Sequence, residues 1–229
     1  MIRELEPVRY TMLSLPLLGL TGVGYTDRGI CFLSTVADEG EFAVRLQQEW
    51  GSPVTRDDRL QEQWRTCLTE WMRDGRCTVP LDVSRLTPFQ QEVLAKTRLI
   101  PRGTVRPYRW LAREVGRPGA CRAVGNVMAR NPIPLLIPCH RVVTASGALG
   151  QYGMGGPAVK ARLLAMEGVD VARLNKLARQ GYRFVGDHSS GRFCYPTCPS
   201  MPADDEVLFR TEAEARAAGY LPCEQCRPV

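Results

Sequence analysis

The chain has 229 residues, of which 24% are charged and 44% hydrophobic, a composition that excludes disordered and fibrous proteins. Its longest apolar run, residues 12–20, contains Pro16 and Gly19 and is too short to span a bilayer. The acidic residues Glu4 and Glu6 before this run are atypical of a signal peptide. We therefore expect a cytoplasmic protein with no membrane association, in which the cysteines are kept reduced.

The charge of the chain is unevenly distributed, and its net value of +6 hides three different segments. Residues 1–82 carry 9 basic and 13 acidic residues, a net charge of −4. Residues 83–172 carry 13 basic and 4 acidic residues, a net charge of +9. Residues 173–229 carry 8 basic and 7 acidic residues, a net charge of +1. The middle segment is therefore predicted to bind a polyanion, although a solvated basic face is the alternative.

Nine cysteines stand beside only two histidines. In a reducing compartment cysteines are more often metal ligands or nucleophiles than disulfide staples, and an odd count leaves at least one thiol unpaired. We therefore expect free thiols, some with chemical roles, rather than a disulfide framework.

Residues 1–82 are predicted to form an α/β domain. Two apolar runs rich in glycine and threonine, residues 17–25 and 29–36, predict a β-hairpin. Apolar residues at four-residue spacing then predict two amphipathic helices: Phe42, Leu46 and Trp50, followed by Leu60, Trp64, Leu68 and Met72. This third carries no recognisable chemistry, and three further residues are predicted to fill the core or its edge: Cys67, Trp71 and Cys77.

A second unit begins near Leu86 with a helix signal, in which Thr87 caps the helix and Gln90 completes a capping box. Two short amphipathic stretches follow on either side of the turn at residues 116–119. Two helices around such a turn have the form of a helix-turn-helix, which would meet nucleic acid. The outer face of the second stretch carries three polar residues at four-residue spacing: Arg122, Asn126 and Arg130. A helical hairpin with a solvated basic face is the alternative.

The segment from Leu135 to Val143 carries the chemistry, because an apolar run leads directly into Cys139 and His140. A cysteine is a nucleophile only as a thiolate, which at neutral pH needs a base or a positive neighbourhood. Neighbouring residues of an extended run point in opposite directions, so we expect a bridging water between these side chains rather than direct contact. A buried structural thiol is the alternative.

The sequence Pro138-Cys139-His140-Arg141-Val142 resembles the active-site signature of the O6-alkylguanine-DNA alkyltransferases, also called methylated-DNA–protein-cysteine methyltransferases. Further matches flank it: Phe89-Gln90, Ile100-Pro101-Arg102-Gly103-Thr104, Tyr108, Arg122-Ala123-Val124-Gly125, Asn131-Pro132, and Lys160 to Glu167-Gly168. The resemblance is continuous from about residue 86 to residue 168. It implies a ribonuclease-H-like α/β domain over residues 1–82, and a mainly α, winged-helix-like catalytic domain over residues 83–170.

The resemblance also implies roles in a reaction. Cys139 would attack the alkyl carbon on O6 of guanine, and on O4 of thymine, in duplex DNA and become a thioether. His140 would take the thiol proton through a water molecule, and Glu167 would orient and charge-stabilise that histidine. Asn131 would hold the turn between the recognition helix and the active-site segment. Because a thioether is not a leaving group, each molecule would react once.

Guanine O6 lies inside its base pair, so the target nucleotide must flip out of the duplex. The resemblance implies that Tyr108 crowds a phosphate beside the target and that Arg122 fills the vacated stack. The other predicted DNA contacts are Asn126, Arg130 and Arg141. Contacts mainly with the backbone predict little sequence preference, and we expect a monomer.

The implied walls of the substrate pocket are Met128, Pro134 and Tyr152. Tyr152 lies in the loop at residues 150–156, which resembles the substrate loop of the family but is one residue longer than in some members. Lys160 has two interpretations, an assisting residue or a solvated helix lysine.

Residues 182–229 are predicted to form a separate, small α+β metal-binding module, joined by a linker at residues 171–181. Four cysteines in the spacing Cys-x3-Cys, 24 residues, Cys-x2-Cys form a zinc-ligand pattern: Cys194, Cys198, Cys223 and Cys226. The module is too small for a core of its own, so zinc would supply much of its folding free energy.

This module resembles the metal-binding domain of the Ada DNA-repair protein through Phe184-Val185-Gly186, Cys194-x3-Cys198-Pro199 and Gly219-Tyr220-x-Pro222-Cys223-x2-Cys226. In that family four cysteines hold zinc, and the first, by position Cys194, accepts a methyl group from a phosphotriester. Here the module comes last in the chain rather than first, without the regulatory helices that follow it in Ada. We therefore favour structural zinc, with methyl acceptance at Cys194 as the alternative.

The sequence thus predicts a self-inactivating methyltransferase for DNA repair. The alternative from another class is a non-catalytic lesion binder or methylation sensor. Relatives that only bind lesions replace the reactive cysteine, whereas this chain keeps Cys139.

Overall fold

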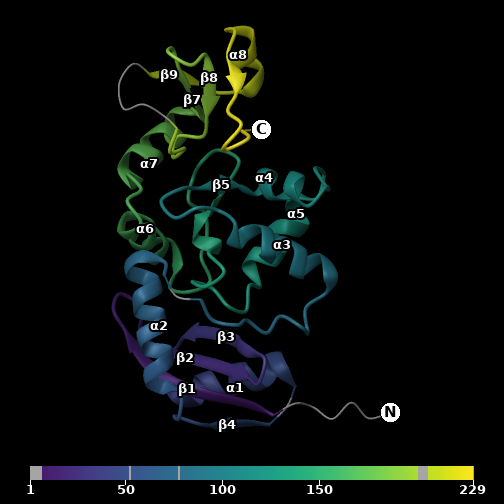
Figure 1. The fold of residues 1–229 in the computed structure, drawn as a ribbon, viewed down its shortest axis with the longest axis vertical. Coiled ribbons are helices and arrows are strands. Elements are labelled where there is room, and N and C mark those ends of the chain that lie inside the picture. The colour runs from purple at the N-terminus through teal and green to yellow at the C-terminus, as the bar shows by residue number, and fades with distance from the viewer. Residues whose placement is uncertain (1–6, 52, 77, 201–205, 229) are drawn as a thin grey trace.

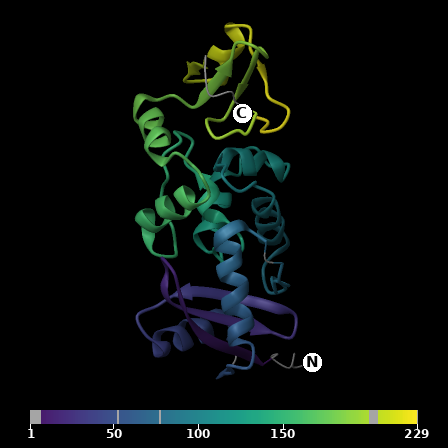
Figure 2. The same cartoon turned by 60° about the vertical axis from the view of Figure 1, so that its left-hand side comes forward.

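The computed structural model describes residues 7–51, 53–76, 78–200 and 206–228. Three regions follow one another along the long axis of the molecule in the order of the chain (Figure 1). A sheet with two helices lies at the N-terminal end, a group of helices lies in the middle, and a small second sheet lies at the other end. Figure 2 shows helix α2 (Gln61–Asp74) running from the first region towards the second.

The N-terminal region is built on a four-stranded sheet of order β3-β2-β1-β4. Its elements are β1 (Val8–Leu15), β2 (Gly19–Thr26), β3 (Gly29–Thr35), α1 (Glu39–Trp50) and β4 (Val54–Arg56), followed by α2. The predicted hairpin, β2 with β3, and the two predicted helices are confirmed, whereas β1 and β4 add to the prediction. The apolar run at residues 12–20 is the end of β1, a turn with Leu17 at φ 70°, and the start of β2.

The two helices cover opposite faces of this sheet because strand side chains alternate. Tyr10 of β1 belongs to the same apolar cluster as Phe42 of α1, whereas Leu13 belongs to the cluster that contains α2. Helix α1 approaches β2 closely at Gly22, where a Cβ atom would lie 2.1 Å from the Phe42 ring. The second cluster continues into the middle region, so α2 joins the two regions.

The middle region consists of short helices joined by a two-stranded parallel ladder. Its elements are α3 (Pro88–Arg98), β5 (Arg106–Pro107), α4 (Tyr108–Glu114), α5 (Cys121–Ala129), β6 (Val142–Val143) and α6 (Gly156–Met166). The predicted capping box is present, since Thr87 and Gln90 donate their backbone N–H groups to each other's side chains at 2.8 and 3.3 Å. The two helices predicted around the turn at residues 116–119 are α4 and α5.

The segment around Cys139 is not the extended run that the sequence predicts. It forms one turn of 3-10 helix, η1 (Cys139–Arg141). Leu135 has a φ of 77°, and the N–H of Cys139 donates to the carbonyl of Ile137 at 2.7 Å, so the chain coils tightly here. The expectation that Cys139 and His140 point in opposite directions therefore has no basis in this turn.

The C-terminal region holds a second four-stranded sheet, of order β10-β8-β7-β9. Its elements are β7 (Phe184–Asp187), β8 (Arg192–Cys194), β9 (Glu206–Phe209), α8 (Glu212–Ala217) and β10 (Leu221–Pro222). The stretch predicted as a linker is helix α7 (Val171–Gln180). The expectation of no local core is wrong, because five aromatic residues are buried together: Phe184, Phe193, Tyr195, Phe209 and Tyr220.

Seven cysteines of the described residues are free thiols: Cys31, Cys121, Cys139, Cys194, Cys198, Cys223 and Cys226. Cys67 is disulfide-bonded, so the expectation of reduced cysteines is wrong at that position. Cys77, also predicted as a core filler, lies outside the described residues. Within the described ranges, no helix combines the length and the apolar character that crossing a membrane requires.

Candidate active site and metal centre

Cys139 is fixed by a clamp at the end of helix α5. The side-chain amide of Asn131 donates to the carbonyl of Ile137 at 3.0 Å, and its carbonyl oxygen accepts from the N–H of Ile133 at 3.1 Å. The loop between α5 and η1 is thus closed by one side chain, in the position that the sequence predicts for Asn131. The result is a cysteine that is only 8% exposed and held in a defined orientation.

A cavity of about 190 Å³ opens onto Cys139. Its lining contains three predicted site residues, Tyr108, Met128 and Tyr152. The rest are Gln151 and Gly153, from the loop that resembles the substrate loop of the family, and Ala129, which the sequence does not single out. Pro134 was predicted as a pocket wall but is not among the lining residues; it forms a β-bridge with Ile137 inside the clamped loop. Gln151 belongs to the lengthened loop at residues 150–156, which places an amide side chain at this cavity.

His140 and Arg141 both engage Glu167 at the start of the chain that leaves α6. Nε2 of His140 lies 3.0 Å from Oε1 of Glu167. Arg141 donates from Nε and Nη2 to the two oxygens of the same carboxylate at 2.9 and 2.8 Å, and from Nη1 to the carbonyl of Ile100. Arg141 is 6% exposed. The prediction of a DNA contact at Arg141 is therefore wrong, since burial and three hydrogen bonds keep its guanidinium inside the protein.

The charges of this group follow from its contacts. Burial by itself raises the pKa of Glu167, but hydrogen bonds from His140 and Arg141 outweigh it and lower that pKa to about 2. Burial lowers the pKa of His140 below its ordinary value, against the opposing effect of Glu167. The histidine is thus neutral at pH 7, and the ionised carboxylate requires its single proton on Nε2. The other nitrogen, Nδ1, is a free base.

Nδ1 of His140 is buried and has no hydrogen-bond partner among the described residues. A buried acceptor without a partner costs free energy, so a polar group that reaches it is stabilised there. Cys139 is the neighbouring residue in the same turn. Nδ1 is therefore the atom that would accept a hydrogen bond, either from a water molecule or from the thiol itself.

Cys139 is a protonated thiol at rest. Burial raises the pKa of its thiol, while the Asn131 side chain, the Lys160 charge and nearby backbone N–H groups oppose that rise. Lys160 is fully buried, and its Nζ donates to the carbonyl of Val142 at 2.6 Å, so its interpretation as a solvated lysine is wrong. Burial lowers the pKa of Lys160 to about 8. A thiol in this setting needs a base at the moment of attack.

The N-terminal region contributes Trp71, which the sequence predicts only as a core filler. The Trp71 ring meets the His140 ring edge to face with centroids 5.9 Å apart, and the Arg141 guanidinium lies 5.4 Å from its centroid. Arg102 bonds the carbonyls of Met72 and Arg73 at the end of α2 and lies 3.6 Å from Glu167. No local pattern distinguishes Trp71 from the other apolar residues of α2, so only the fold reveals this contact.

Helix α5 presents two different faces. Val124 and Met128 are buried, and Met128 reaches the cavity beside Cys139. The opposite face is exposed and carries the three residues predicted to meet DNA: Arg122, Asn126 and Arg130. Tyr108 lies at the first position of α4, where it is half-buried at the cavity. The same helix thus carries an exposed polar face and, through Met128 and Ala129 near its end, part of the cavity beside Cys139.

The four predicted metal ligands meet at one point. The sulfurs of Cys194, Cys198, Cys223 and Cys226 all lie within 4.8 Å of one another, and all four residues are buried. Those of Cys198 and Cys223 are 3.9 Å apart. Tetrahedral zinc with Zn–S bonds of about 2.3 Å holds its sulfurs about 3.8 Å apart, so the donor set fits zinc in a closed structural site.

The metal-binding turns also touch the middle region. The hydroxyl of Thr197, between two of the cysteines, accepts from the N–H of Val105 at 2.8 Å. Arg227 donates to Glu114 of α4 at 2.8 Å. Val105 leads into β5, and β5 pairs with β6, which directly follows η1. The metal centre and Cys139 are therefore linked through one short ladder.

A buried thiol beside a neutral histidine, at a cavity bordered by an exposed basic helix, defines a cysteine-nucleophile transferase that acts on nucleic acid. Residues 88–169 match the family described as 6-O-methylguanine DNA methyltransferase, DNA binding domain, and residues 172–229 match the metal binding domain of Ada. The chain belongs to the methylated-DNA–protein-cysteine methyltransferase family, and it carries an Ada-type zinc module.

Individual relatives support this assignment. The methylated-DNA–protein-cysteine methyltransferase of Cricetulus griseus is 34% identical over 174 residues, which cover 71% of this chain and 83% of that protein. The bifunctional transcriptional activator/DNA repair enzyme Ada of Escherichia coli is 37% identical over 163 residues, covering 70% of this chain and 45% of Ada. The crystal structure of Mycobacterium tuberculosis OGT in complex with DNA has a TM-score of 0.56 at 30% identity, over 70% of this chain and 93% of that one.

Proposed function

We propose that this protein repairs DNA by moving the alkyl group of O6-alkylguanine, and also of O4-alkylthymine, onto Sγ of Cys139 in a single turnover. The observation that carries the proposal is the position of Cys139 at the cavity, followed in the chain by His140, whose Nδ1 has no partner among the described residues and whose Nε2 meets Glu167. The Sγ–carbon bond forms as the bond between carbon and O6 breaks. The thiol proton passes to Nδ1, through a bridging water, and finally to the departing guanine.

Each neighbouring residue has a part in this step. Glu167 fixes the proton of His140 on Nε2 and stabilises the imidazolium that forms when Nδ1 takes the thiol proton. Arg141 holds that carboxylate in place. The Lys160 charge favours the thiolate as it develops. Asn131 keeps the thiol in its orientation.

The partner is duplex DNA with an alkylated base. The exposed face of α5 meets the backbone through Arg122, Asn126 and Arg130, while Tyr108 stands where the target nucleotide enters. The base is flipped into the cavity, since its O6 is otherwise inside the pair, and Arg122 fills the stack. Recognition through the backbone gives little sequence preference. We propose that the protein acts as a monomer in the cytoplasm.

The domain organisation that accompanies this function is also a proposal. It consists of a ribonuclease-H-like domain at residues 1–82, a winged-helix-like catalytic domain at 83–170, a linker at 171–181 and the metal-binding module at 182–229. The contact of Trp71 with His140 supports a role of the first domain in shaping the active site.

In the metal-binding module, Cys194, Cys198, Cys223 and Cys226 hold zinc. The bound ion keeps the four sulfurs deprotonated and cross-links the turns that carry them. The role is structural, because all four donors are buried protein ligands. Methyl acceptance from a phosphotriester at Cys194 is the second candidate, and it draws on a cavity of about 300 Å³ that reaches this residue.

A stoichiometric transfer assay tests the main proposal. A duplex with one O6-methylguanine is mixed in molar excess with the protein, and loss of the lesion is followed over time. The wild type removes one methyl group per molecule and then stops, and Cys139→Ala removes none. Cys121→Ala, which changes a free thiol on α5, is the matched control and keeps full stoichiometry. Turnover beyond one equivalent, or transfer by Cys139→Ala, would contradict the proposal.

A further inference from the structure

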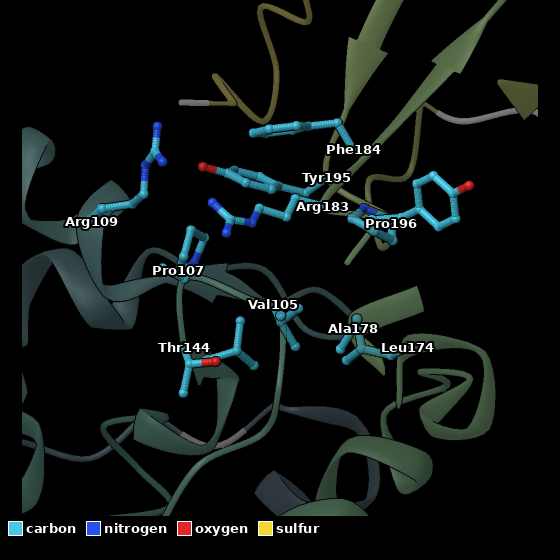
Figure 3. Close-up of a pocket in the computed structure, with 14 residues that line it drawn as sticks. Val105, Pro107, Arg109, Thr144, Leu174, Ala178, Arg183, Phe184, Tyr195 and Pro196 are labelled. Atoms are coloured by element: carbon cyan, nitrogen blue, oxygen red, sulfur yellow. The ribbon is translucent and has the colours of Figure 1, made fainter. Parts of the chain in front are cut away.

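The seam between the middle and C-terminal regions holds a crevice that the alkyl-transfer step does not use. Residues of α4, β5 and the loop after β6 line one side, and residues of α7 and of the chain around β7 and β8 line the other (Figure 3). Its enclosed volume is about 30 Å³, which is close to the share of one water molecule in the liquid. A nucleobase does not fit inside, so a ligand of this crevice must bind at its mouth.

Two arginines stand at that mouth without a counter-charge. Arg109 of α4 and Arg183, just before β7, both line the crevice, and neither side chain has a hydrogen bond or an ion pair within the described part of the chain. Nε of Arg183 is buried and lacks an acceptor. Among the residues that the structure describes, no aspartate or glutamate lines the crevice. Figure 3 shows both guanidinium groups on the same side, with the Tyr195 hydroxyl between them.

Two unpaired guanidinium groups at an apolar wall create a site for an anion. Like charges held together repel, and a buried N–H without an acceptor costs free energy, so an anion that meets both groups relieves both costs. The planar fork of arginine matches the oxygens of a phosphate. An apolar floor beneath the fork strengthens the pairing, because water is largely absent there.

We propose that Arg109 and Arg183 together bind one backbone phosphate of the same DNA whose target base enters the Cys139 cavity. This inference rests on the proposed function and extends it to the zinc module. Tyr108 lines the catalytic cavity and Arg109, the next residue, lines the crevice. Neighbouring Cα atoms are about 3.8 Å apart, and phosphates of one strand advance about 3.4 Å along the helix axis. The phosphate therefore belongs to a nucleotide close to the target.

The zinc module thereby becomes part of the DNA-binding surface. Arg183 leads into β7, whose sheet contains the ligand Cys194 at the end of β8. Zinc that holds the module against the middle region also holds Arg183 opposite Arg109. The module thus acts on the affinity of the protein for DNA and leaves the chemistry at Cys139 unchanged.

The first test is the salt dependence of binding to an unmodified duplex. Arg183→Gln should weaken binding about tenfold and reduce the slope of log K against log salt by about one, since one phosphate contact is lost. Arg216→Gln removes the same charge from α8 of the same module, where Arg216 pairs with Glu212, and should change neither quantity. Arg183→Lys keeps the charge and should retain most of the slope. Equal slopes for wild type and Arg183→Gln would overturn the inference.

The second test locates the phosphate. Single phosphates near the lesion are replaced, one at a time, by neutral methylphosphonates. One position should weaken binding of the wild type and have no further effect on Arg183→Gln; a scan with no such position would overturn the inference. Transfer from the free base O6-methylguanine, which carries no phosphate, separates the two proposals. It should be equal in wild type and Arg183→Gln, and its absence in the wild type would count against the proposed function instead.

Discussion

Cysteine serves two opposite purposes in this molecule. Cys139 is a single thiol at an open cavity, and a neutral histidine stands beside it. The four cysteines of the C-terminal region lie within 4.8 Å of one another, with no base among them. Both centres are buried, so burial does not separate a reactive sulfur from a structural one. The neighbouring groups distinguish the two kinds of sulfur. The Cys139 sulfur lies at a cavity that a substrate carbon can enter, whereas the other four sulfurs converge on one metal position.

The difference also appears in what each centre requires from the rest of the fold. Cys139 depends on distant elements, since α5 supplies the Asn131 clamp, α6 leads to Glu167 and α2 supplies Trp71. The metal centre is made by two local turns of the chain. A substitution around Cys139 should therefore alter rates, and a substitution among the four cysteines should alter folding.

The largest expected effect is on the metal centre. Cys226→Ala removes a fully buried ligand and should abolish tight zinc retention, together with the cooperative unfolding of the C-terminal region. Structural zinc contributes on the order of 10 kcal/mol of apparent binding free energy. Cys31→Ala, at a buried thiol outside both centres, is the control and should retain zinc. The measurements are zinc content after dialysis and thermal unfolding; full zinc retention by Cys226→Ala would refute the structural role.

A smaller effect is expected at the carboxylate behind His140. Glu167→Gln leaves Arg141 buried without a counter-charge, so the free energy of unfolding should fall by about 3 kcal/mol. Transfer should slow by at least about a hundredfold, because the base loses its partner. Glu114→Gln removes a surface partner of Arg227 and should cost less than about 1 kcal/mol. Denaturant unfolding and single-turnover rates check both variants, and a fast Glu167→Gln would argue against the role of His140 as a base.

The pH dependence of stability should follow from the same pair. The pKa of Glu167 is about 2 when folded, below its ordinary value of 4.5, so the unfolded chain binds more protons between these values. This stability is fully present above pH 4.5 and is lost as the pH falls towards 2, and it amounts to about 3 kcal/mol. The lowered pKa of His140 acts in the same direction, starting below pH 6.5.

Denaturant unfolding of wild type and Glu167→Gln from pH 7 to pH 3 measures this contribution. The difference between the two should shrink as the pH falls below 4.5, because the carboxylate is then protonated in the unfolded chain. A difference that stays constant over this range would show that the Glu167 charge does not stabilise the fold. Loss of zinc at low pH affects both proteins equally, so it cancels in the difference between their free energies of unfolding.

The smallest effect concerns the contact between the N-terminal region and the active site. Trp71→Leu removes the ring against His140 and Arg141 and should slow transfer a few-fold, in line with about 1 kcal/mol for such ring contacts. Trp64 lies two turns earlier on the same face of α2, where it contacts Tyr25, so Trp64→Leu should lose stability without a change in rate. Single-turnover assays at matched folded fractions compare the two. Equal transfer rates in both variants would show that the contact of Trp71 with His140 and Arg141 does not affect the reaction.

Much of the local structure could be predicted from the sequence because it rests on short-range signals. The capping box at Thr87, the helices around the turn at 116–119 and the spacing of the four zinc ligands are local patterns, and the structure shows all three. The strand β1 escaped prediction because its apolar residues merge with those of β2 across the turn at Leu17. Strand β4 is only three residues long and is defined by its partner β1.

The errors at the site arise where a residue's role depends on the tertiary structure. Arg141 lies within a basic segment, so the sequence predicts a contact with DNA. In the structure its guanidinium instead bonds the carboxylate of Glu167, 26 residues further along the chain. Lys160 has the spacing of a surface helix residue but is buried under β6. Cys67 shows no sign of a disulfide in its local sequence. For Arg141 and Lys160, partners far along the chain decide the outcome.

Mapping the transferred group tests the central claim most directly. The protein is incubated with duplex DNA that carries O6-methylguanine, digested, and analysed by peptide mass. We expect one added methyl group on the peptide that contains Cys139, and none on the peptides that contain Cys121 or Cys194. Loss of the lesion from DNA with the Cys139 peptide unmodified would contradict it.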